Sequence, residues 1–417
     1  MTSIECIIIG AGHSGLTVSS CLRDLGIEHV ILERGDIAQA WRTQRWPSLR
    51  LLTPNWQNGL RDFAYRGDDP DGFMTAAEFA DSVLDYAAYI DAPVMTGSEV
   101  VSVRFEAGRY AVTVERMVDG EKRTQVYSAR AVVLANGACS LPDIPSVAAN
   151  IPPSLQTYSA FDYRDPEDLP DGPVLVVGAS ATGIQLANEI HASGREVTLS
   201  VGEHVRLPRR YRGKDIQWWL NETGVLDETY EDIDDLQRAR NIPSPQIVGT
   251  EDNHTLDLNA LSEKGVALVG RFAGLHQGQA QFSGSLKNVC KLADLKMNRL
   301  LNTIDEWVEE AGLDDAFPVG ERPEATRVPA QPPLLLPLDR FGSVLWATGF
   351  KPDWSFLELE GVFDRKGRLR HNGGTVGPGL YVIGLTFLRR RKSSFILGAQ
   401  ADAEDISRHL ADYLAEI

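Results

Sequence analysis

The stretch CIIIGAGHSGLTVSSCLRDLGIEHVILE, residues 6–33, decides the fold of this chain. Three isoleucines lead into the turn Gly10–Gly15, a helical pattern of apolar residues continues to Leu25, and a second apolar run ends on Glu33. Strand, glycine-rich turn, helix, strand and acid, in this order, form the unit that binds the ADP half of a dinucleotide. The sequence therefore predicts a dinucleotide site in this stretch.

Each glycine of this turn is expected to have its own task. Gly10 permits the tight turn, Gly12 lets the backbone approach a pyrophosphate, and Gly15 lets the helix pack on the strand. The helix N-terminus offers N–H groups to the phosphates, and Glu33 is placed to accept hydrogen bonds from the adenosine ribose. His13 is expected to pack against the cofactor rather than to act as a base. The residues assigned to this first cofactor are Gly10, Gly12, His13, Ser14, Gly15, Glu33 and Arg34.

The composition restricts the class of protein. The 417 residues correspond to about two or three domains, and the net charge of −17 argues against nucleic acid or an anionic membrane as a partner. The four cysteines are far apart and form no C-x-x-C, which fits a reducing compartment. The sequence has no signal peptide, no stretch of about 20 apolar residues and no histidine pair with metal-ligand spacing. We therefore expect a cytoplasmic protein without a metal site or a membrane span.

The opening pattern recurs in the middle of the chain. An apolar strand at 174–177 precedes G-A-S-A-T-G, a helical pattern follows, and a second strand lies at 197–199. Ser180 replaces the middle glycine, and its small side chain still permits close approach of the backbone to a phosphate. The residues assigned to this second nucleotide are Gly178, Ser180, Ala181, Thr182 and Gly183.

The two units differ where their second strands end. Ser200 occupies the place of Glu33, and Arg206 and Arg209 follow. A hydroxyl group with nearby arginines suits a 2′-phosphate, which a carboxylate would repel, so the second nucleotide is predicted to be NADPH. Glu203 argues against this choice, and the alternative is that the arginines belong to a solvated loop.

The end of the chain repeats features of its beginning. The strand at 344–346 is followed by Ala347, Thr348 and Gly349, which echo residues 134–137, and a strand at 379–384 precedes a helix from about Phe395. We therefore expect an α/β protein with two nested Rossmann-like three-layer domains. The first would comprise residues 1–165 and 330–417, and the second, residues 166–329, would be inserted into it.

With these motifs the sequence resembles the class B flavin-dependent monooxygenases, which belong to the flavoproteins with two dinucleotide-binding domains. The resemblance implies FAD in the first unit, NADPH in the second, and oxidation of a small organic molecule by molecular oxygen through a C4a-(hydro)peroxyflavin. It also implies an active-site role near the flavin for Asn55, in T-P-N-W. It places Trp41, Ala347, Thr348, Gly349, Gly384 and Gly398 among the cofactor-binding residues. A homodimer is a possible assembly.

One motif departs from this family. The pattern F-x-G-x-x-x-H-x-x-x-Y before the second fingerprint retains only Tyr163, with Pro153, Leu155 and Ser159 in place of the Phe, Gly and His. The missing histidine favours an alternative, an NADPH-dependent flavin oxidase or reductase that releases peroxide. A regulatory or redox-sensing flavoprotein is a further alternative. The basic run 389–392 could bind an anionic substrate, although a solvated loop is the favoured interpretation.

Overall fold

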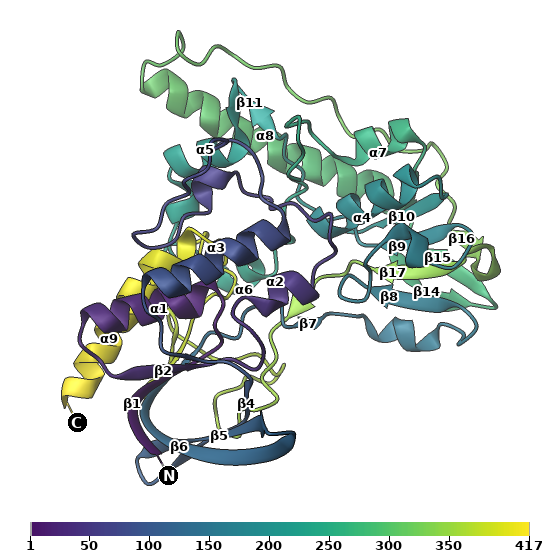
Figure 1. Ribbon diagram of the computed structural model, residues 1–417. Helices are drawn as coiled ribbons and strands as arrows, with labels where there is room; N and C mark the ends of the chain where they lie inside the picture. Colours follow the sequence, from purple (N-terminus) through teal and green to yellow (C-terminus); the bar gives the residue numbers. More distant parts are fainter. Residues whose placement is uncertain (1, 417) are drawn as a thin grey trace.

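Two large sheets, the first mixed and the second parallel, organise the computed structural model, which describes residues 2–416 (Figure 1). The first sheet has the strand order β19-β20-β6-β1-β2-β3, and the β4–β5 hairpin extends it from β6. Its strands are β1 (Thr2–Ile9), β2 (His29–Leu32), β3 (Val94–Met95), β4 (Ser98–Glu106), β5 (Arg109–Val118), β6 (Glu121–Leu134), β19 (Thr375–Gly377) and β20 (Leu380–Val382).

Strand β1 lies at the centre of the first sheet. It pairs in parallel with β2 and β6, with Ile7 opposite both Val30 and Val132. Both faces of such a strand are covered, which explains the continuous apolar run of three isoleucines instead of an alternating pattern. Helices α1 (His13–Asp24), α3 (Ala76–Tyr89) and α9 (Gly398–Glu416) gather on one side of the strands in Figure 1, and the long strands β5 and β6 curl beneath them.

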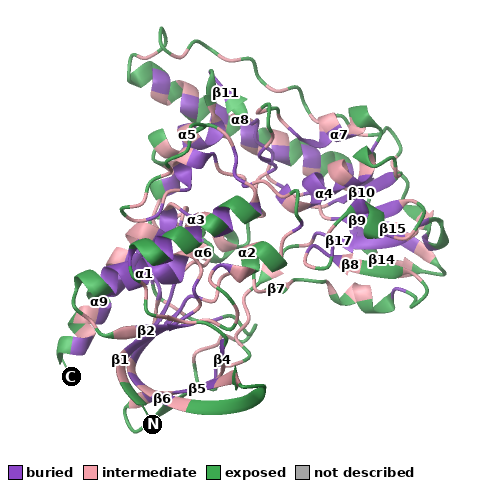
Figure 2. Cartoon of the chain, viewed as in Figure 1, coloured by how far each residue is buried: buried purple, intermediate pink, exposed green. Residues whose placement is uncertain are grey.

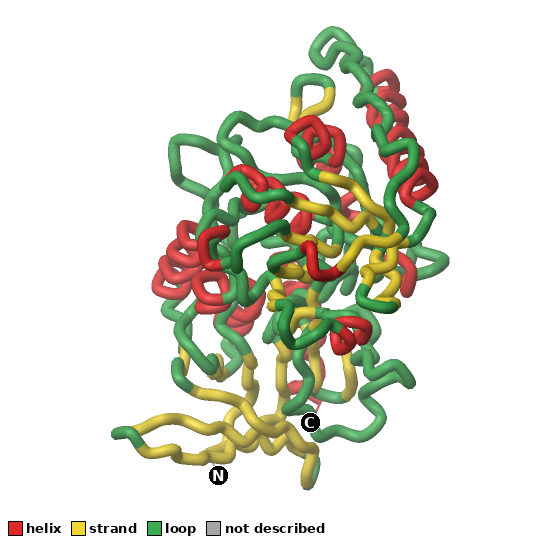
Figure 3. Tube along the Cα trace, turned by 90° about the vertical axis from the view of Figure 1, so that its right-hand side faces the viewer, coloured by secondary structure: helices red, strands yellow, loops and turns green. Residues whose placement is uncertain are grey.

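Strand β6 serves two parts of the first sheet. Its first half pairs antiparallel with β5, while its last residues pair in parallel with β1 and β20. The hairpin that the alternating pattern around Ala107 and Gly108 indicates is present as β4 and β5. Seen from the side in Figure 3, these strands project from the base of the molecule.

The second sheet has the order β13-β10-β9-β17-β8, and all four of its strand pairs are parallel. A small antiparallel sheet, β14-β15-β16, belongs to the same domain. The main elements of the second domain are β8 (Gln156–Ser159), β9 (Val174–Val177), α4 (Ala181–Ala192), β10 (Val197–Val201), α7 (Leu258–Lys264), β13 (Ala267–Gly270), β14 (Phe272–His276), β15 (Gln279–Phe282), α8 (Leu286–Glu310), β16 (Leu335–Pro337) and β17 (Ser343–Trp346). Figure 2 shows that burial concentrates in the two sheets and on the helix faces that cover them.

The nesting of the domains follows the expected plan, but the crossing points differ. Val344 of β17 pairs with Leu175 of β9 and with Thr157 of β8, so both outer strands belong to the second sheet. The chain crosses between the domains at a two-stranded ribbon formed by β7 (Leu141–Pro142) and β18 (Phe350–Lys351). The boundaries predicted from the sequence, at 165 and 330, assign β8 and β17 to the first domain. They divide the second sheet, because neither strand carries a sequence signal that identifies its partner strand.

Several helix predictions can be compared directly. Thr75 caps α3 in a capping box with Glu78, as the sequence indicates. Helix α8 starts at Leu286, and α9 starts at Gly398 rather than near the predicted Phe395. The remaining short elements are α2 (Gln39–Thr43), η1 (Asn55–Gln57), η2 (Ser146–Asn150), η3 (Pro166–Asp168), β11 (Arg210–Tyr211), β12 (Lys214–Asp215), α5 (Ile216–Glu222), η4 (Val225–Asp227), α6 (Leu236–Arg240) and η5 (Leu338–Arg340). Among residues 2–416, no helix is both long enough and apolar enough to pass through a bilayer.

Candidate functional site

The first glycine turn is shaped by contacts that only glycine allows. Gly10 has φ +108°, and a Cβ atom there would lie 2.6 Å from the carbonyl oxygen of Ala135. A Cβ atom at Gly15 would overlap the carbonyl oxygen of Gly10. At Gly12, by contrast, no atom of the described chain lies within 4 Å of that position. The turn is therefore closed on the protein side and open beside Gly12, a form that fits a pyrophosphate.

The N-terminus of α1 carries no capping side chain. Gly12 is its N-cap residue, and the described residues place no side-chain acceptor on its first N–H groups, whereas α3 has the full Thr75–Glu78 box. These unpaired N–H groups fit an anionic ligand. Ser14 is buried in the first turn of α1, and a Cβ atom at Gly384 would lie 2.9 Å from its Oγ. Gly384, with φ +80°, thus packs against the glycine turn.

Glu33 lies beside this turn. Its Oε2 accepts a hydrogen bond of 2.8 Å from the Ala11 N–H, and its Oε1 accepts one of 2.9 Å from the Gly35 N–H. Each carboxylate oxygen retains a further lone pair, so the side chain can also accept a ribose hydroxyl. Arg34 is exposed on the neighbouring surface.

An aromatic cluster covers the helix end. The ring of Phe79 contacts His13 edge-on at 6.1 Å and Trp41 at 4.9 Å between centroids. Burial lowers the pKa of His13 from 6.5 to about 4, so its imidazole is neutral near pH 7. A neutral ring packed on Phe79 agrees with a packing role for His13.

Asn55 is buried and held by the backbone. Its Nδ2 donates to the carbonyl oxygen of Asp69 at 2.9 Å, and its Oδ1 accepts from the N–H of Met74 at 2.8 Å. These bonds fix the loop before α3. One N–H and one lone pair of the amide remain available to a ligand.

The second glycine turn reproduces the geometry of the first. Gly178 has φ +112° and meets the carbonyl oxygen of Ala347, as Gly10 meets Ala135, and a Cβ at Gly183 would overlap the carbonyl oxygen of Gly178. Ser180 precedes α4 without donating or accepting a cap bond within the described chain. Ala347, Thr348 and Gly349 are therefore the second-domain counterpart of residues 135–137. Ala181 is buried and Thr182 half-buried in the first turn of α4.

Gln246 joins this second turn from a distant loop. Its Nε2 donates to the carbonyl oxygen of Ala179 at 2.5 Å, and its Oε1 is buried without a hydrogen-bond partner among the described residues. Sequence reasoning missed this residue because 67 positions separate the two partners and no local pattern marks the contact.

The residues assigned to the 2′-phosphate are engaged inside the protein. Ser200 Oγ donates to the Gly270 carbonyl at 3.0 Å and accepts from the Phe272 N–H at 2.8 Å. Both guanidinium groups are buried and ion-paired. Arg206 pairs with Asp257 and Asp294, and Arg209 pairs with Asp215. As placed, these side chains do not offer free charge to a nucleotide, so the sequence argument for a 2′-phosphate loses its basis here.

An exposed cation lies at the same edge of the sheet. The stem of Arg271 passes Gly202, whose hypothetical Cβ would be 3.7 Å from the Arg271 Cγ. Gly202 follows β10 directly, at the level of Ser200. In residues 2–416 the Arg271 guanidinium has no carboxylate within ion-pair distance.

The basic run 389–392 is neither a solvated loop nor an open anion site. Its four cations pair with carboxylates of α9 and of the second domain: Arg389 with Asp405, Arg390 with Asp402 and Asp405, Arg391 with Glu228, and Lys392 with Asp227. The backbone N–H groups of Arg391 and Lys392 also donate to residues 228 and 226. The run thus fixes the entry to α9, whose first residue, Gly398, packs against the Lys392 carbonyl.

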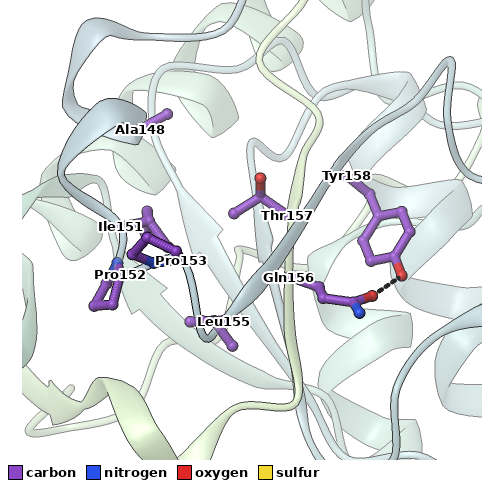
Figure 4. A pocket seen from close by; sticks show the side chains of 8 residues that line it. All are labelled: Ala148, Ile151, Pro152, Pro153, Leu155, Gln156, Thr157 and Tyr158. Carbon is purple, nitrogen blue, oxygen red and sulfur yellow. Dashed lines mark hydrogen bonds between the residues drawn. The ribbon is translucent and has the colours of Figure 1, made fainter.

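A hollow beside β8 contains none of these residues. It measures about 360 Å³ and is lined by a single stretch of chain, shown in Figure 4: Ala148, Ile151, Pro152, Pro153, Leu155, Gln156, Thr157 and Tyr158. On the β8 side of the hollow, the Tyr158 hydroxyl donates to the Gln156 side chain (Figure 4). It lies at the outer strand of the second sheet, two strands away from the Gly178 turn.

Sequence comparisons agree with the two turns. The model of a family described as pyridine nucleotide-disulphide oxidoreductase matches residues 7–225. An oxidoreductase of Geobacillus kaustophilus, named CzcO-like, is 29% identical over 97% of this chain and 99% of its own length. The indole-3-pyruvate monooxygenase YUCCA6 of Arabidopsis thaliana is 30% identical over 50% of each chain.

Solved structures share the fold along almost the whole chain. A flavin-containing monooxygenase from Stenotrophomonas maltophilia has a TM-score of 0.66 at 19% identity, and a bacillithiol disulfide reductase from Bacillus cereus has 0.62 at 16%. Both comparisons cover 99% of each chain. They confirm the predicted two-domain α/β fold. Because the two neighbours are named for different reactions, the fold does not select the reaction.

Proposed function

The chain belongs to the pyridine nucleotide-disulphide oxidoreductase family, and from this premise we propose that it is an NADPH-dependent flavoprotein monooxygenase acting on a small organic molecule. The observation that carries the proposal is the pair of equivalent glycine turns, at Gly10 and Gly178, each before an uncapped helix. Two such turns in one chain call for two dinucleotides. The acid Glu33 beside the first turn supports FAD there and the nicotinamide nucleotide at the second.

Different residues would bind the two nucleotides. The N–H groups at the start of α1 would hold the FAD pyrophosphate, and Glu33 would hold the ribose. The start of α4 would hold the second pyrophosphate, and Arg271, whose stem passes Gly202, would offer its exposed cation to a 2′-phosphate. A bound flavin accepts hydride and reacts with molecular oxygen. Asn55 would contribute the free N–H of its amide near the ring.

The cysteines argue against a disulfide reductase. Cys6, Cys21 and Cys290 are buried, and all four cysteines are free thiols distributed over separate elements. Burial raises the pKa of the Cys21 thiol to about 11 and that of Cys290 to about 12, which suppresses the reactive thiolate. A dithiol relay therefore has no support in this chain. Replacing Cys139, the exposed cysteine, by serine is expected to leave NADPH oxidation unchanged.

Oxygen accounting tests the proposal. The purified protein should contain about one FAD per chain, and a screen of sulfur, nitrogen and carbonyl compounds should find one that lowers peroxide released per NADPH oxidised and appears as an oxygenated product. After reduced protein is mixed with oxygen, absorbance distinct from both oxidised and reduced flavin should appear transiently. Peroxide equal to NADPH consumed, with every compound tried, would instead identify an oxidase.

The oxidase is the second candidate because of one residue. Ser159, at the position of the family histidine, is buried and donates to Asp162 at 2.7 Å, so it supplies no imidazole. A regulatory flavoprotein, the third candidate, would be excluded by rapid turnover of NADPH by the isolated protein.

A further inference from the structure

Three side-chain amides crowd into one short turn. Asn55, Gln57 and Asn58 lie in or directly after η1, with exposed fractions of 5%, 1% and 2%. Backbone groups pair both atoms of the Asn55 amide. Asn58 donates to the carbonyl of Thr53 at 3.1 Å and accepts from its hydroxyl. Gln57 differs from both, since neither its Oε1 nor its Nε2 has a partner anywhere in the described chain.

A buried amide without hydrogen-bond partners lowers the stability of the folded protein. Burying one unpaired polar atom costs about 1–3 kcal/mol, and more than about 90% of buried polar groups in proteins have a partner. Glutamine is also mostly an exposed residue. A leucine or methionine would fill the same space without this cost. A ligand that supplies both an acceptor and a donor would satisfy the Gln57 amide.

The turn lies in the first domain, and contacts of its neighbouring residues tie it to α1, α3 and α9. Arg61, four residues after Gln57, donates to Ser20 of α1 at 3.0 Å and lies 3.6 Å from Glu404 of α9. On its other side, Asn55 fixes the turn to the start of α3. Leu60 belongs to the same apolar cluster as Leu16 of α1 and Ile406 of α9. The N-terminus of α1, in the same domain, is the proposed pyrophosphate site, and the flavin ring of the same cofactor would extend from it.

We propose that Gln57 binds the flavin ring through both atoms of its amide. A primary amide offers an N–H and a C=O side by side, and the pyrimidine edge of a flavin offers the matching C=O and N–H. Asn55 and Asn58 use part of their capacity to hold the loop, so Gln57 is the amide of this turn with its full capacity free. The inference rests on the proposed flavin-dependent function and adds a residue to its cofactor site.

The expected effects separate ligand binding from folding. Gln57→Leu removes the unpaired amide, so the flavin-free protein should be at least as stable to urea as the wild type. Its dissociation constant for FAD should rise about 10- to 100-fold, the loss of two hydrogen bonds in a buried site. Its flavin midpoint potential should fall, because the reduced ring gains negative charge that an N–H donor stabilises.

Asn58→Leu is the matched control in the same turn. It leaves the Thr53 carbonyl without its partner, so the flavin-free protein should lose stability. The experiment measures urea unfolding of the flavin-free proteins, FAD affinity by fluorescence quenching, and the midpoint potential. Gln57→Leu with unchanged affinity and potential overturns the inference while leaving the proposed function intact. Absence of FAD binding by the wild type overturns both, and loss of flavin-free stability in Gln57→Leu assigns the amide to folding.

Discussion

Gly12 and Gly15 are three residues apart, yet a methyl group at each has opposite consequences. At Gly12, where φ is −80° and the space is open, alanine meets no protein atom. At Gly15 it meets the carbonyl oxygen of Gly10. Gly12→Ala should therefore keep the stability of the flavin-free protein and lose FAD affinity, because the methyl group enters the ligand's space. Gly15→Ala should lose stability by about 2 kcal/mol or more. Thermal unfolding and FAD titration of both variants check this, and equal effects on folding would contradict it.

Two arginines of the second domain, Arg206 and Arg271, are expected to respond to substitution in opposite ways. Arg206→Met removes the cation between Asp257 and Asp294 and should cost about 3–5 kcal/mol of unfolding free energy, because two buried carboxylates lose their partner. Arg271→Ala should leave stability unchanged and raise KM for NADPH several-fold more than KM for NADH, since only NADPH carries the 2′-phosphate. Urea unfolding and steady-state kinetics with both nucleotides provide the measurements. A nucleotide effect confined to Arg206 would restore the assignment made from sequence.

His13 makes stability depend on pH. The pKa of His13 is about 4 in the folded protein, because burial disfavours the charged ring, and 6.5 is its ordinary value. Below pH 6.5 the unfolded chain therefore takes up a proton that the folded protein does not, and stability falls as the pH decreases. The slope from this one residue is at most about 1.4 kcal/mol per pH unit. His13→Gln should reduce the slope of unfolding free energy between pH 6.5 and 5 by up to that amount, measured by urea titration. An identical slope would show that His13 is not the responsible group.

At the scale of elements, hydroxyl groups before two helices provide a matched pair. Thr75 Oγ1 accepts from the Glu78 N–H at 3.2 Å, and Glu78 accepts from the Thr75 N–H at 2.7 Å. Ser285 precedes α8 without a cap bond in the described chain. Thr75→Ala should therefore cost about 1 kcal/mol and Ser285→Ala much less. Chemical denaturation of the two variants measures the difference, and equal costs would exclude the capping box as its cause.

The sequence predicted elements with a strong local pattern. The first unit, the capped helix α3 and the β4–β5 hairpin follow from periodicity and turn chemistry. The two-residue strands β7 and β18 could not be predicted, because a strand of this length has no period and exists only through its partner. The fate of Arg206 and Arg209 was equally hidden, since their partners are fixed by the tertiary structure. Gln57 carried no signal at all, because a buried amide is recognised only from its surroundings.

At the scale of the whole molecule, the first domain depends on the last elements of the chain. Helix α9 packs on α1, and β20 completes the sheet beside β6. The sequence indicated this return through the strand at 379–384, while the exact crossings required the strand partners. A chain that ends before α9 should lose FAD binding and protection of β1 amides from hydrogen exchange. The β9 amides should remain protected, because that sheet is complete within residues 156–346. Full FAD binding without α9 would contradict the dependence.

The nested connection also sets an order of events on the ribosome. Strand β6 emerges early, but its neighbour β20 is synthesised only after the entire second domain has passed. At about 5 to 20 residues per second, the open edge of β6 waits on the order of tens of seconds for its partner. During translation this edge is a target for chaperones or for wrong pairing with another nascent chain. The second domain, continuous in sequence, can acquire its structure first, and the proposed flavin site is then the last part of the protein to form.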